Sequence, residues 1–369
     1  MKRYFPYLLM LIFLSILIGA NIYLVHRFNF YFSSENPKIF YIIFPALTLL
    51  MFFGVFPLSN AISRTGSLVY IVSASTMGIL LYLLISVLTV DFISLFIKFT
   101  PGMMGLSALA ITFLVSAYGI LNSWILHVTR LEIAIKGLSK EVRAMHLSDI
   151  HLGHFRGKNF LQKIVDKTNK QNVDLVFITG DLFDGRIRLT KENLAPLTQL
   201  RAPLFFIEGN HDRYTGVEII KDYLRKLNVT VLENEIANWG ELQIIGLNHM
   251  RADGETYNMH AAGNSSTIKG TLENLPIRKN KPAILLHHSP DGIKYANEHG
   301  VDLYLAGHTH AGQLFPVKYI AALIFQYNKG LHDFKGTKIF VSQGAGTFGP
   351  PMRVGTKSEI TLINLIPGL

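Results

Sequence analysis

Four long apolar stretches near the start limit what this chain of 369 residues can fold into. They cover residues 4–25, 39–58, 67–90 and 103–127. A helix rises about 1.5 Å per residue, so about 20 apolar residues are enough to cross a hydrocarbon core of about 30 Å. We therefore predict a four-helix transmembrane domain over residues 1–128, followed by a linker over residues 129–141.

The charges that flank these stretches indicate how the chain crosses the membrane. Lys2 and Arg3 precede the first stretch, but its apolar core is long and no A-x-A cleavage site ends it, so we expect a retained helix. Four crossings return the chain to its starting side. The basic residues on that side would be Lys2, Arg3, Arg64, Arg130, Lys136, Lys140 and Arg143, against Arg27, Lys38 and Lys98 opposite. This bias predicts a multi-pass protein of the cell membrane with a cytoplasmic C-terminal domain.

None of the four stretches carries an ionisable residue at its centre. Such a residue is the usual mark of a proton or ion pathway. We therefore expect the helices to act as anchors in the lipid bilayer rather than as a transport path.

From residue 142 onward the pattern changes to short apolar runs rich in β-branched and aromatic residues. These runs are 142–148, 174–179, 204–208, 243–247, 283–287, 302–306, 338–342 and 359–364. Two intervening stretches, 158–171 and 217–227, place apolar residues three and four apart, as helices that cover a sheet do. The pattern predicts one α/β domain with buried strands over residues 142–369.

Polar motifs follow five of these predicted strands. They read SDIHLG, GDLFDG, GNHDR, HHSPDG and GHTHAGQ. Loops at the carboxyl ends of strands converge on one crevice of an open α/β sheet, so we expect one shared site. Asp149 and His151 lie two residues apart, as do His308 and His310, and alternate residues at a strand end share a face.

The side chains in these motifs are those of metal ligands. They offer imidazoles, carboxylates and one amide, and the chain has no cysteine. This mixture suits Mn²⁺, Fe or Zn²⁺ better than Ca²⁺ or Mg²⁺, which prefer oxygen ligands alone. Because a single zinc needs only three or four ligands, the larger set predicts two divalent metal ions.

The ordered series DIH, GDLFD, GNHD, HHSP and GHTH resembles the calcineurin-like metallophosphoesterase superfamily over residues 142–367. The later part of the chain is similar to a membrane-associated branch that includes YkuE-like proteins, lipid A-pathway pyrophosphohydrolases and transmembrane proteins with a metallophosphoesterase domain. The resemblance implies a two-sheet β-sandwich flanked by helices. It also implies seven metal ligands, namely Asp149, His151, Asp181, Asn210, His288, His308 and His310.

The resemblance further implies a role for each motif residue. Asp149, His151 and His310 would hold one metal ion, Asn210 and His308 would hold the other, and Asp181 would bridge the two. In the family pattern one residue separates the ligand of the HHSP motif from the proline, which selects His288 rather than His287.

The implied reaction is hydrolysis of a phosphoester or pyrophosphate without a covalent intermediate. A hydroxide shared by the two ions would attack phosphorus in line with the leaving oxygen. His211 would protonate the leaving group, with Asp212 orienting its ring. Arg353 would meet a substrate phosphate with its forked guanidinium, or would be an ordinary surface arginine.

Five polar residues are harder to place from sequence. Asp184 is either a partner of a metal ligand or a turn residue. His146, His154, His249 and His260 fall outside the motifs, and we expect structural roles for them. His249 is the best candidate among these histidines for lining the site.

The stretch 314–331 is unusually apolar for a connection between a ligand motif and the next strand. We expect it to form a hydrophobic lip that faces the bilayer and admits a lipid-linked phosphate or pyrophosphate. The alternative is that it packs beneath the sheet.

Two other classes of function stay open at this point. The domain could be a non-catalytic nucleotide-binding part of a membrane transport or signalling protein. It could also be a nuclease, but a nuclease needs a basic groove with stacking aromatic residues, and no long Lys/Arg cluster predicts one. We therefore expect no nucleic-acid partner, and the sequence does not indicate any protein partner.

Overall fold

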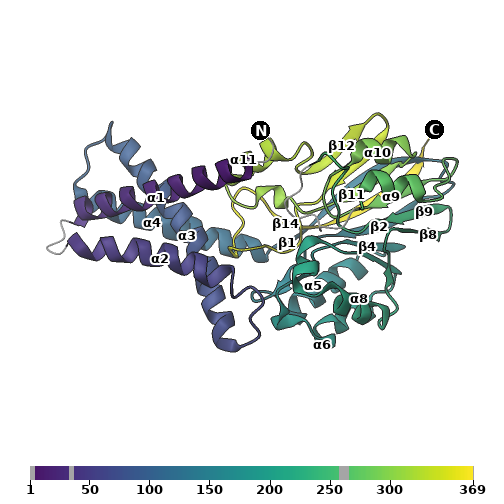
Figure 1. Cartoon of the computed structure of the whole chain (residues 1–369), viewed down its shortest axis with the longest axis horizontal. Coiled ribbons are helices and arrows are strands. Elements are labelled where there is room, and N and C mark those ends of the chain that lie inside the picture. Colours follow the sequence, from purple (N-terminus) through teal and green to yellow (C-terminus); the bar gives the residue numbers. More distant parts are fainter. Residues whose placement is uncertain (1–4, 33–36, 257–265, 369) are drawn as a thin grey trace. The chain divides into compact units, whose positions relative to one another are not determined.

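The structure is a computed structural model that describes residues 5–32, 37–256 and 266–368 (Figure 1). Its contacts divide the chain into two compact units. The helical unit consists of 1–58, 68–120 and 349–351, and the α/β unit of 59–67, 121–348 and 352–369. The α/β unit therefore includes a short segment from between two of the N-terminal helices.

The helical unit contains the apolar N-terminal helices. They are α1 (Phe5–Phe32), a 3-10 turn η1 (Pro37–Ile39), α2 (Phe40–Val55), α3 (Arg64–Ser94) and α4 (Pro101–Trp124). Three segments among the described residues are long and apolar enough to cross a membrane, namely Leu11–Phe32, Arg64–Ser94 and Pro101–Trp124. Three of the four predicted spans are therefore helices with the length and apolar composition needed to cross a membrane. The remaining helix, α2, has 16 residues and would be about 24 Å long.

Among the described residues of the helical unit, one ion pair joins two helices. Arg27 on α1 pairs with Asp91 on α3, and the hydroxyl groups of Tyr23 and Tyr31 also donate to the Asp91 carboxylate. The predicted spans end at residues 25 and 90, but α1 and α3 continue past them to include this pair. The pair therefore lies near the C-terminal ends of both helices rather than at their centres.

The α/β unit is built on two six-stranded sheets. The first has the order β1-β14-β2-β4-β6-β7 and the second the order β12-β13-β11-β10-β9-β8. The strands of the first sheet are β1 (Leu126–Lys136), β2 (Val142–Leu147), β4 (Leu175–Thr179), β6 (Leu204–Ile207), β7 (Thr230–Val231) and β14 (Ser358–Gly368). Those of the second are β8 (Glu235–Trp239), β9 (Leu242–Gly246), β10 (Ala283–Leu286), β11 (Leu303–Ala306), β12 (Gly330–Phe334) and β13 (Thr337–Val341).

Alternating side chains explain how these sheets build the core. Along β10, Ile284 and Leu286 join an apolar cluster that also includes Phe177 and Phe205 of the first sheet. Leu285, which lies between them, faces the other way and packs in a second apolar cluster. Since successive strand residues point to opposite faces, the two sheets share one core and keep a second apolar face for helices.

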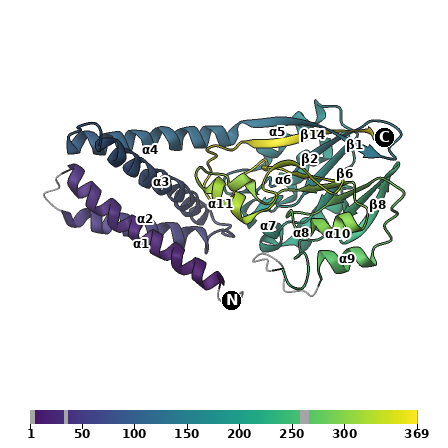
Figure 2. The same ribbon diagram turned by 90° about the horizontal axis from the view of Figure 1, so that it is seen from above.

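Helices cover the outer face of each sheet. In Figure 1, α5 (Lys158–Asn169), α6 (Lys191–Leu194) and α8 (Val217–Arg225) lie below the strands, whereas α9 (Ile268–Asn274) and α10 (Ile293–Glu298) are drawn over the upper strands, close to β12. Figure 2 shows the same layers from above. The remaining short elements are β3 (Leu152–Gly153), β5 (Phe183–Asp184), η2 (Arg186–Arg188), η3 (Ala195–Gln199), α7 (Asn210–Thr215), η4 (His310–Gly312) and α11 (Val317–Ile324).

The eight predicted strands are all present, but the predicted linker at 129–141 is mostly strand. It contains most of β1, which pairs in parallel with β14 from Leu126 opposite Ser358 to Lys136 opposite Gly368. Ile133 and Ile135 are buried in the core between the sheets. This apolar alternation makes the segment an edge strand of the first sheet rather than a linker.

Candidate metal centre

Parallel strands deliver the predicted ligands to one edge of the two sheets. Strands β2, β4 and β6 are parallel neighbours in the first sheet, and β10 and β11 are parallel neighbours in the second. The predicted ligands Asp149, Asp181, Asn210, His288 and His308 each follow the last residue of one of these strands by two or three positions. The loops at these carboxyl ends therefore meet.

Five of the seven predicted ligands have a left-handed backbone. Their φ angles are 51° at Asp149, 52° at His151, 52° at Asp181, 70° at His308 and 48° at His310. A residue other than glycine in this region costs about 1 kcal/mol or more, and such strain persists where the surrounding structure demands it. The concentration of strained residues in these loops marks them as a functional site.

Two glycines let the loops approach each other closely. A Cβ atom at Gly209 would lie 2.1 Å from Asp181 Oδ1, and one at Gly307 would lie 2.1 Å from Asp149 Oδ2. Any larger residue at either position would push a carboxylate out of place. The glycines of GNHD and GHTH therefore keep the carboxylates within reach of the other loops.

Asp149, His151 and His310 form the first group of side chains that could hold a metal ion. The Nε2 atoms of His151 and His310 lie 3.0 Å apart, and His310 Nε2 lies 3.3 Å from Asp149 Oδ1. All three residues are buried. Two imidazole nitrogens and a carboxylate oxygen thus converge on one point.

Asp181, His288 and His308 form the second group. His288 Nε2 lies 3.1 Å from Asp181 Oδ2 and 3.3 Å from His308 Nδ1. The same Asp181 oxygen lies 3.6 Å from His151 Nε2 of the first group. Asp181 therefore stands between the two groups, where a carboxylate can serve both.

Buried polar atoms without partners test whether the side chains fit metal ions. Asn210 Oδ1 is buried and has no hydrogen-bond partner among the described residues. A buried amide oxygen normally finds a donor, so a missing partner requires an explanation. This oxygen, the carboxylates and the paired imidazole nitrogens are a donor set that fits divalent cations.

His211 takes its orientation from Asp184 rather than from Asp212. His211 Nδ1 lies 3.0 Å from Asp184 Oδ1, and Asp184 Oδ2 lies 3.7 Å from His151 Nδ1. Burial opposes a positive charge on His211, but the carboxylates of Asp181 and Asp184 outweigh it and raise the pKa of His211 to about 10. Asp184 is thus a partner of site residues and not merely a turn residue.

The prediction that Asp212 orients His211 is wrong because its carboxylate is occupied elsewhere. Gly209 N donates to Asp212 Oδ2 at 2.9 Å, and Phe183 N donates to Oδ1 at 3.0 Å. Burial and the negative charge of Asp181 raise the pKa of Asp212 to about 7. Asp212 holds together the loops that follow β4 and β6.

Arg353 is neither a surface arginine nor available to a substrate phosphate, which corrects both predictions for it. The residue is 0% exposed. Its Nη2 donates to the carbonyl oxygens of Gln343 at 2.5 Å and Gly346 at 2.7 Å and lies 3.2 Å from His310 Nδ1. The guanidinium therefore binds backbone carbonyl oxygens and contacts His310, a predicted ligand, at Nδ1.

Sequence comparison identifies the family of the chain. The family model described as calcineurin-like phosphoesterase matches residues 142–312. An uncharacterized metallophosphoesterase of Aquifex aeolicus is 32% identical over 266 residues, which are 69% of this chain and 97% of that protein. The chain belongs to the calcineurin-like metallophosphoesterase family.

Relatives that extend beyond this metallophosphoesterase domain are also similar. An uncharacterized metallophosphoesterase of Helicobacter pylori strain J99 is 37% identical over 240 residues, covering 64% of this chain and 62% of that protein. A Danio rerio protein named transmembrane protein with metallophosphoesterase domain is 34% identical over 277 residues, covering 70% of this chain and 62% of that protein. The chain thus spans about three fifths of the length of these two relatives.

Of the two adjacent histidines in this metallophosphoesterase, only one points to the ligand groups. His287 is occupied elsewhere, because its Nδ1 lies 2.7 Å from Ser289 O and its Nε2 accepts from Met250 N at 3.4 Å. His288 uses Nδ1 on Thr179 O at 2.8 Å and directs Nε2 towards Asp181.

His249 is a buried neighbour of the metallophosphoesterase ligands. Neither of its ring nitrogens has a hydrogen-bond partner among the described residues. Its ring centroid lies 5.6 Å from that of His288 and 5.9 Å from that of His308. This placement agrees with the expectation that His249 lines the site.

His146 and His154, also outside the motifs, belong to none of the metallophosphoesterase ligand groups. His146 packs behind the site, where its Nε2 lies 2.8 Å from Thr179 Oγ1. His154 contacts Ser59, after α2, and Ser67, in the first turn of α3. His260 lies outside the described residues.

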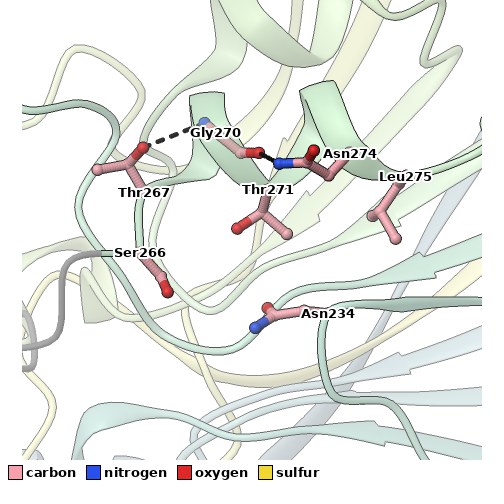
Figure 3. A pocket seen from close by; sticks show the side chains of 7 residues that line it. All are labelled: Asn234, Ser266, Thr267, Gly270, Thr271, Asn274 and Leu275. Atoms are coloured by element: carbon pink, nitrogen blue, oxygen red, sulfur yellow. Dashed lines mark hydrogen bonds between the residues drawn. The ribbon is translucent and has the colours of Figure 1, made fainter.

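A separate hollow of about 510 Å³ lies beside α9 of the metallophosphoesterase domain (Figure 3). It is lined by Asn234, Ser266, Thr267, Gly270, Thr271, Asn274 and Leu275. Figure 3 shows that Thr267 accepts from Gly270 N and that Asn274 donates to Gly270 O, so these groups serve the helix itself. None of the lining residues belongs to the metal-binding groups.

Proposed function

We propose that this metallophosphoesterase hydrolyses a phosphoester or pyrophosphate and uses two divalent cations as cofactors. These cations are Mn²⁺, Fe or Zn²⁺. The observation that carries the proposal is the position of Asp181 between the two ligand groups, 3.1 Å from His288 Nε2 and 3.6 Å from His151 Nε2. One cation would be held by Asp149, His151 and His310 and the other by Asn210, His288 and His308, with Asp181 serving both.

When bound, such cations lower the pKa of water to near neutrality and offset the charge on phosphoryl oxygens. The protein's own side chains orient the site and provide the proton for the leaving group. Asp184 engages His211 Nδ1, which leaves His211 Nε2 to give a proton to the leaving oxygen. His211 N also donates to Asp181 Oδ1 at 2.8 Å, which fixes this histidine relative to the shared carboxylate.

We propose further that the protein is a multi-pass membrane protein with its catalytic domain on the cytoplasmic side. The basic residues around α3 and α4 support this orientation, because Arg64, Arg130, Lys136, Lys140 and Arg143 flank these helices on the side of the domain, against Lys98 in the α3–α4 connection. The substrate would then be within reach of the membrane surface.

The stretch 314–331 supports a lipid-linked substrate. It forms the helix α11 rather than an open loop, and this helix presents Tyr319, Ile320, Leu323 and Ile324 at exposed fractions of 58%, 56%, 88% and 69%. Phe325, directly after α11, places its ring centroid 5.7 Å from that of His308. Side chains this exposed do not pack beneath the sheet, and an apolar face beside a ligand suits the chains of a lipid.

Hydrolysis assays on the full chain in detergent with Mn²⁺ test the proposal. The substrates are bis-p-nitrophenyl phosphate, a lipid pyrophosphate and single-stranded DNA, and the control is Asp181→Asn. We expect the wild type to hydrolyse both phosphoric esters and the variant to lose both activities. Binding of a nucleotide without any turnover would favour a non-catalytic domain, and DNA cleavage that depends on Asp181 would favour a nuclease.

A further inference from the structure

The segment Ser59–Ser67, which leads from α2 into the first turn of α3, belongs to the α/β unit. One imidazole holds both of its ends: His154 Nε2 lies 2.8 Å from Ser59 O, and His154 Nδ1 lies 2.9 Å from Ser67 Oγ. Because a carbonyl oxygen only accepts, Nε2 carries the proton and donates to Ser59. In the neutral ring, Nδ1 then accepts from the Ser67 hydroxyl.

Two further contacts hold the start of this segment. Gly185 has a φ of 95°, and a Cβ atom there would lie 2.2 Å from Ser59 O. Only a residue without a side chain allows this approach. Asn60 Nδ2 donates to Tyr214 O at 3.2 Å.

These contacts involve residues that lie close in sequence to His151, Asp184 and His211, a third group of side chains that could hold a metal ion. His154 lies three residues after His151, Gly185 directly follows Asp184, and Tyr214 lies three residues after His211 on α7.

Two short strands tie the first two of these contacts together. Leu152 pairs with Phe183 and Gly153 with Asp184 in the small sheet of β3 and β5. His154 and Gly185 directly follow these paired strands. A displacement of the Ser59–Ser67 segment would therefore be transmitted through the sheet to His151 and Asp184.

We propose that the Ser59–Ser67 segment is a positioning element of the metal centre, clamped by His154, and that it lies in the same compartment as the catalytic domain. The topology follows from the chain. Only α3 and α4 separate this segment from β1, and both are long and apolar enough to cross a membrane. Two crossings return the chain to the same side and place the α3–α4 connection on the opposite side.

Single cysteines test the shared compartment, because the natural chain has none. Ile62→Cys lies in the segment, Lys140→Cys in the α/β unit and Lys98→Cys in the α3–α4 connection, and all three residues are exposed. Each variant is labelled with a membrane-impermeant maleimide in right-side-out and in inside-out vesicles. We expect Ile62→Cys and Lys140→Cys to react in one vesicle type and Lys98→Cys in the other. Labelling of Ile62→Cys opposite to Lys140→Cys, or of Lys98→Cys together with them, would overturn the proposal.

Histidine variants of the full chain test the positioning role, which rests on the proposed hydrolytic function. Loss of a residue that orients a metal ligand costs about tenfold or more in activity, so we expect His154→Ala to lower kcat/KM for bis-p-nitrophenyl phosphate by about tenfold. His154→Gln keeps one donor and one acceptor and should recover most of this loss. Ser67→Ala removes one of the two bonds and should show a smaller loss.

His332→Ala, at a half-exposed position in β12, is the matched control and should retain wild-type activity. Mn²⁺ affinity, measured by calorimetric titration, should fall in His154→Ala and not in the control. Wild-type kcat/KM and Mn²⁺ affinity in His154→Ala would overturn the positioning role. An inactive wild-type protein would count against the proposed function, whereas the cysteine labelling would still decide the topology.

Discussion

His288 Nε2, in the loop after β10 of one sheet, lies 3.1 Å from Asp181 Oδ2, in the loop after β4 of the other. The adjacent His287 directs both ring nitrogens to backbone atoms of Ser289 and Met250 instead. The neighbouring imidazoles therefore have different tasks although both are fully buried.

We expect His288→Ala to lose one bound metal ion per chain and His287→Ala to keep the full complement. Removing a direct ligand should cost at least as much as removing a residue that orients one, which is about 10–100-fold in activity. Elemental analysis of both purified variants gives the metal content, and bis-p-nitrophenyl phosphate gives the activity. Retention of both ions in His288→Ala, with loss in His287→Ala, would reverse the assignment.

The contact between His211 and Asp184 predicts a dependence on the leaving group. Proton donation to a leaving oxygen contributes about 10²–10⁴-fold for poor leaving groups and little for p-nitrophenolate. His211→Ala should therefore slow hydrolysis of alkyl phosphodiesters much more than that of bis-p-nitrophenyl phosphate. Asp184→Asn should follow the same trend to a smaller extent. Equal losses on both substrates would show that His211 does not act as the proton donor.

The exposed face of α11 predicts a split between lipid and soluble substrates. Ile320→Ser combined with Leu323→Ser removes two exposed apolar side chains without touching a ligand group. We expect slower turnover of a lipid pyrophosphate in vesicles and unchanged turnover of bis-p-nitrophenyl phosphate. Ala322→Ser, at another exposed position of the same helix, is the matched control. The lipid hypothesis fails if the double variant hydrolyses the lipid as fast as this control.

His146 predicts how the metal-free protein responds to acid. Burial lowers the pKa of His146 from 6.5 to about 3, with the charge of Asp149 opposing the shift. The unfolded chain takes up a proton at His146 below pH 6.5 while the folded chain stays neutral until about pH 3. Between pH 6.5 and about pH 3, the free energy of unfolding therefore falls as the pH falls, by about 1.4 kcal/mol per pH unit.

Urea unfolding of the wild type and of His146→Gln measures this effect. The fluorescence of Trp239 in β8 can follow unfolding of the α/β unit. Between pH 6 and pH 4 the free energy of unfolding should fall less steeply in the variant, by about 1.4 kcal/mol per pH unit. Parallel curves for the two proteins would mean that His146 takes up its proton equally well in the folded state.

Local patterns predicted the strands and the positions of the ligand motifs. Asp149, Asp181 and His308 follow apolar runs, and parallel strands bring the loops after such runs to one edge. The missed strand β1 also carried a local signal, because its apolar residues alternate. That signal was obscured by the long apolar stretch directly before it.

The partners of individual side chains depended on contacts that no local pattern contains. Arg353 is buried among carbonyl groups of its own loop and beside His310, although its neighbours in sequence are only Met352 and Val354. Asp184 was in a recognised motif, but its partner His211 lies 27 residues away. The contact of His154 with Ser59 spans 95 residues and links a helix connection to a loop of the sheet. Such pairings arise only from the packed structure.

The metal content of the purified full chain, measured together with turnover, tests the central claim most directly. We expect two divalent cations per chain, loss of bis-p-nitrophenyl phosphate hydrolysis on chelation and its recovery with Mn²⁺. Asp181→Asn should lose metal and activity together, whereas Asp166→Asn, at an exposed site on α5, should keep both. Undiminished turnover after complete removal of divalent cations would contradict the account.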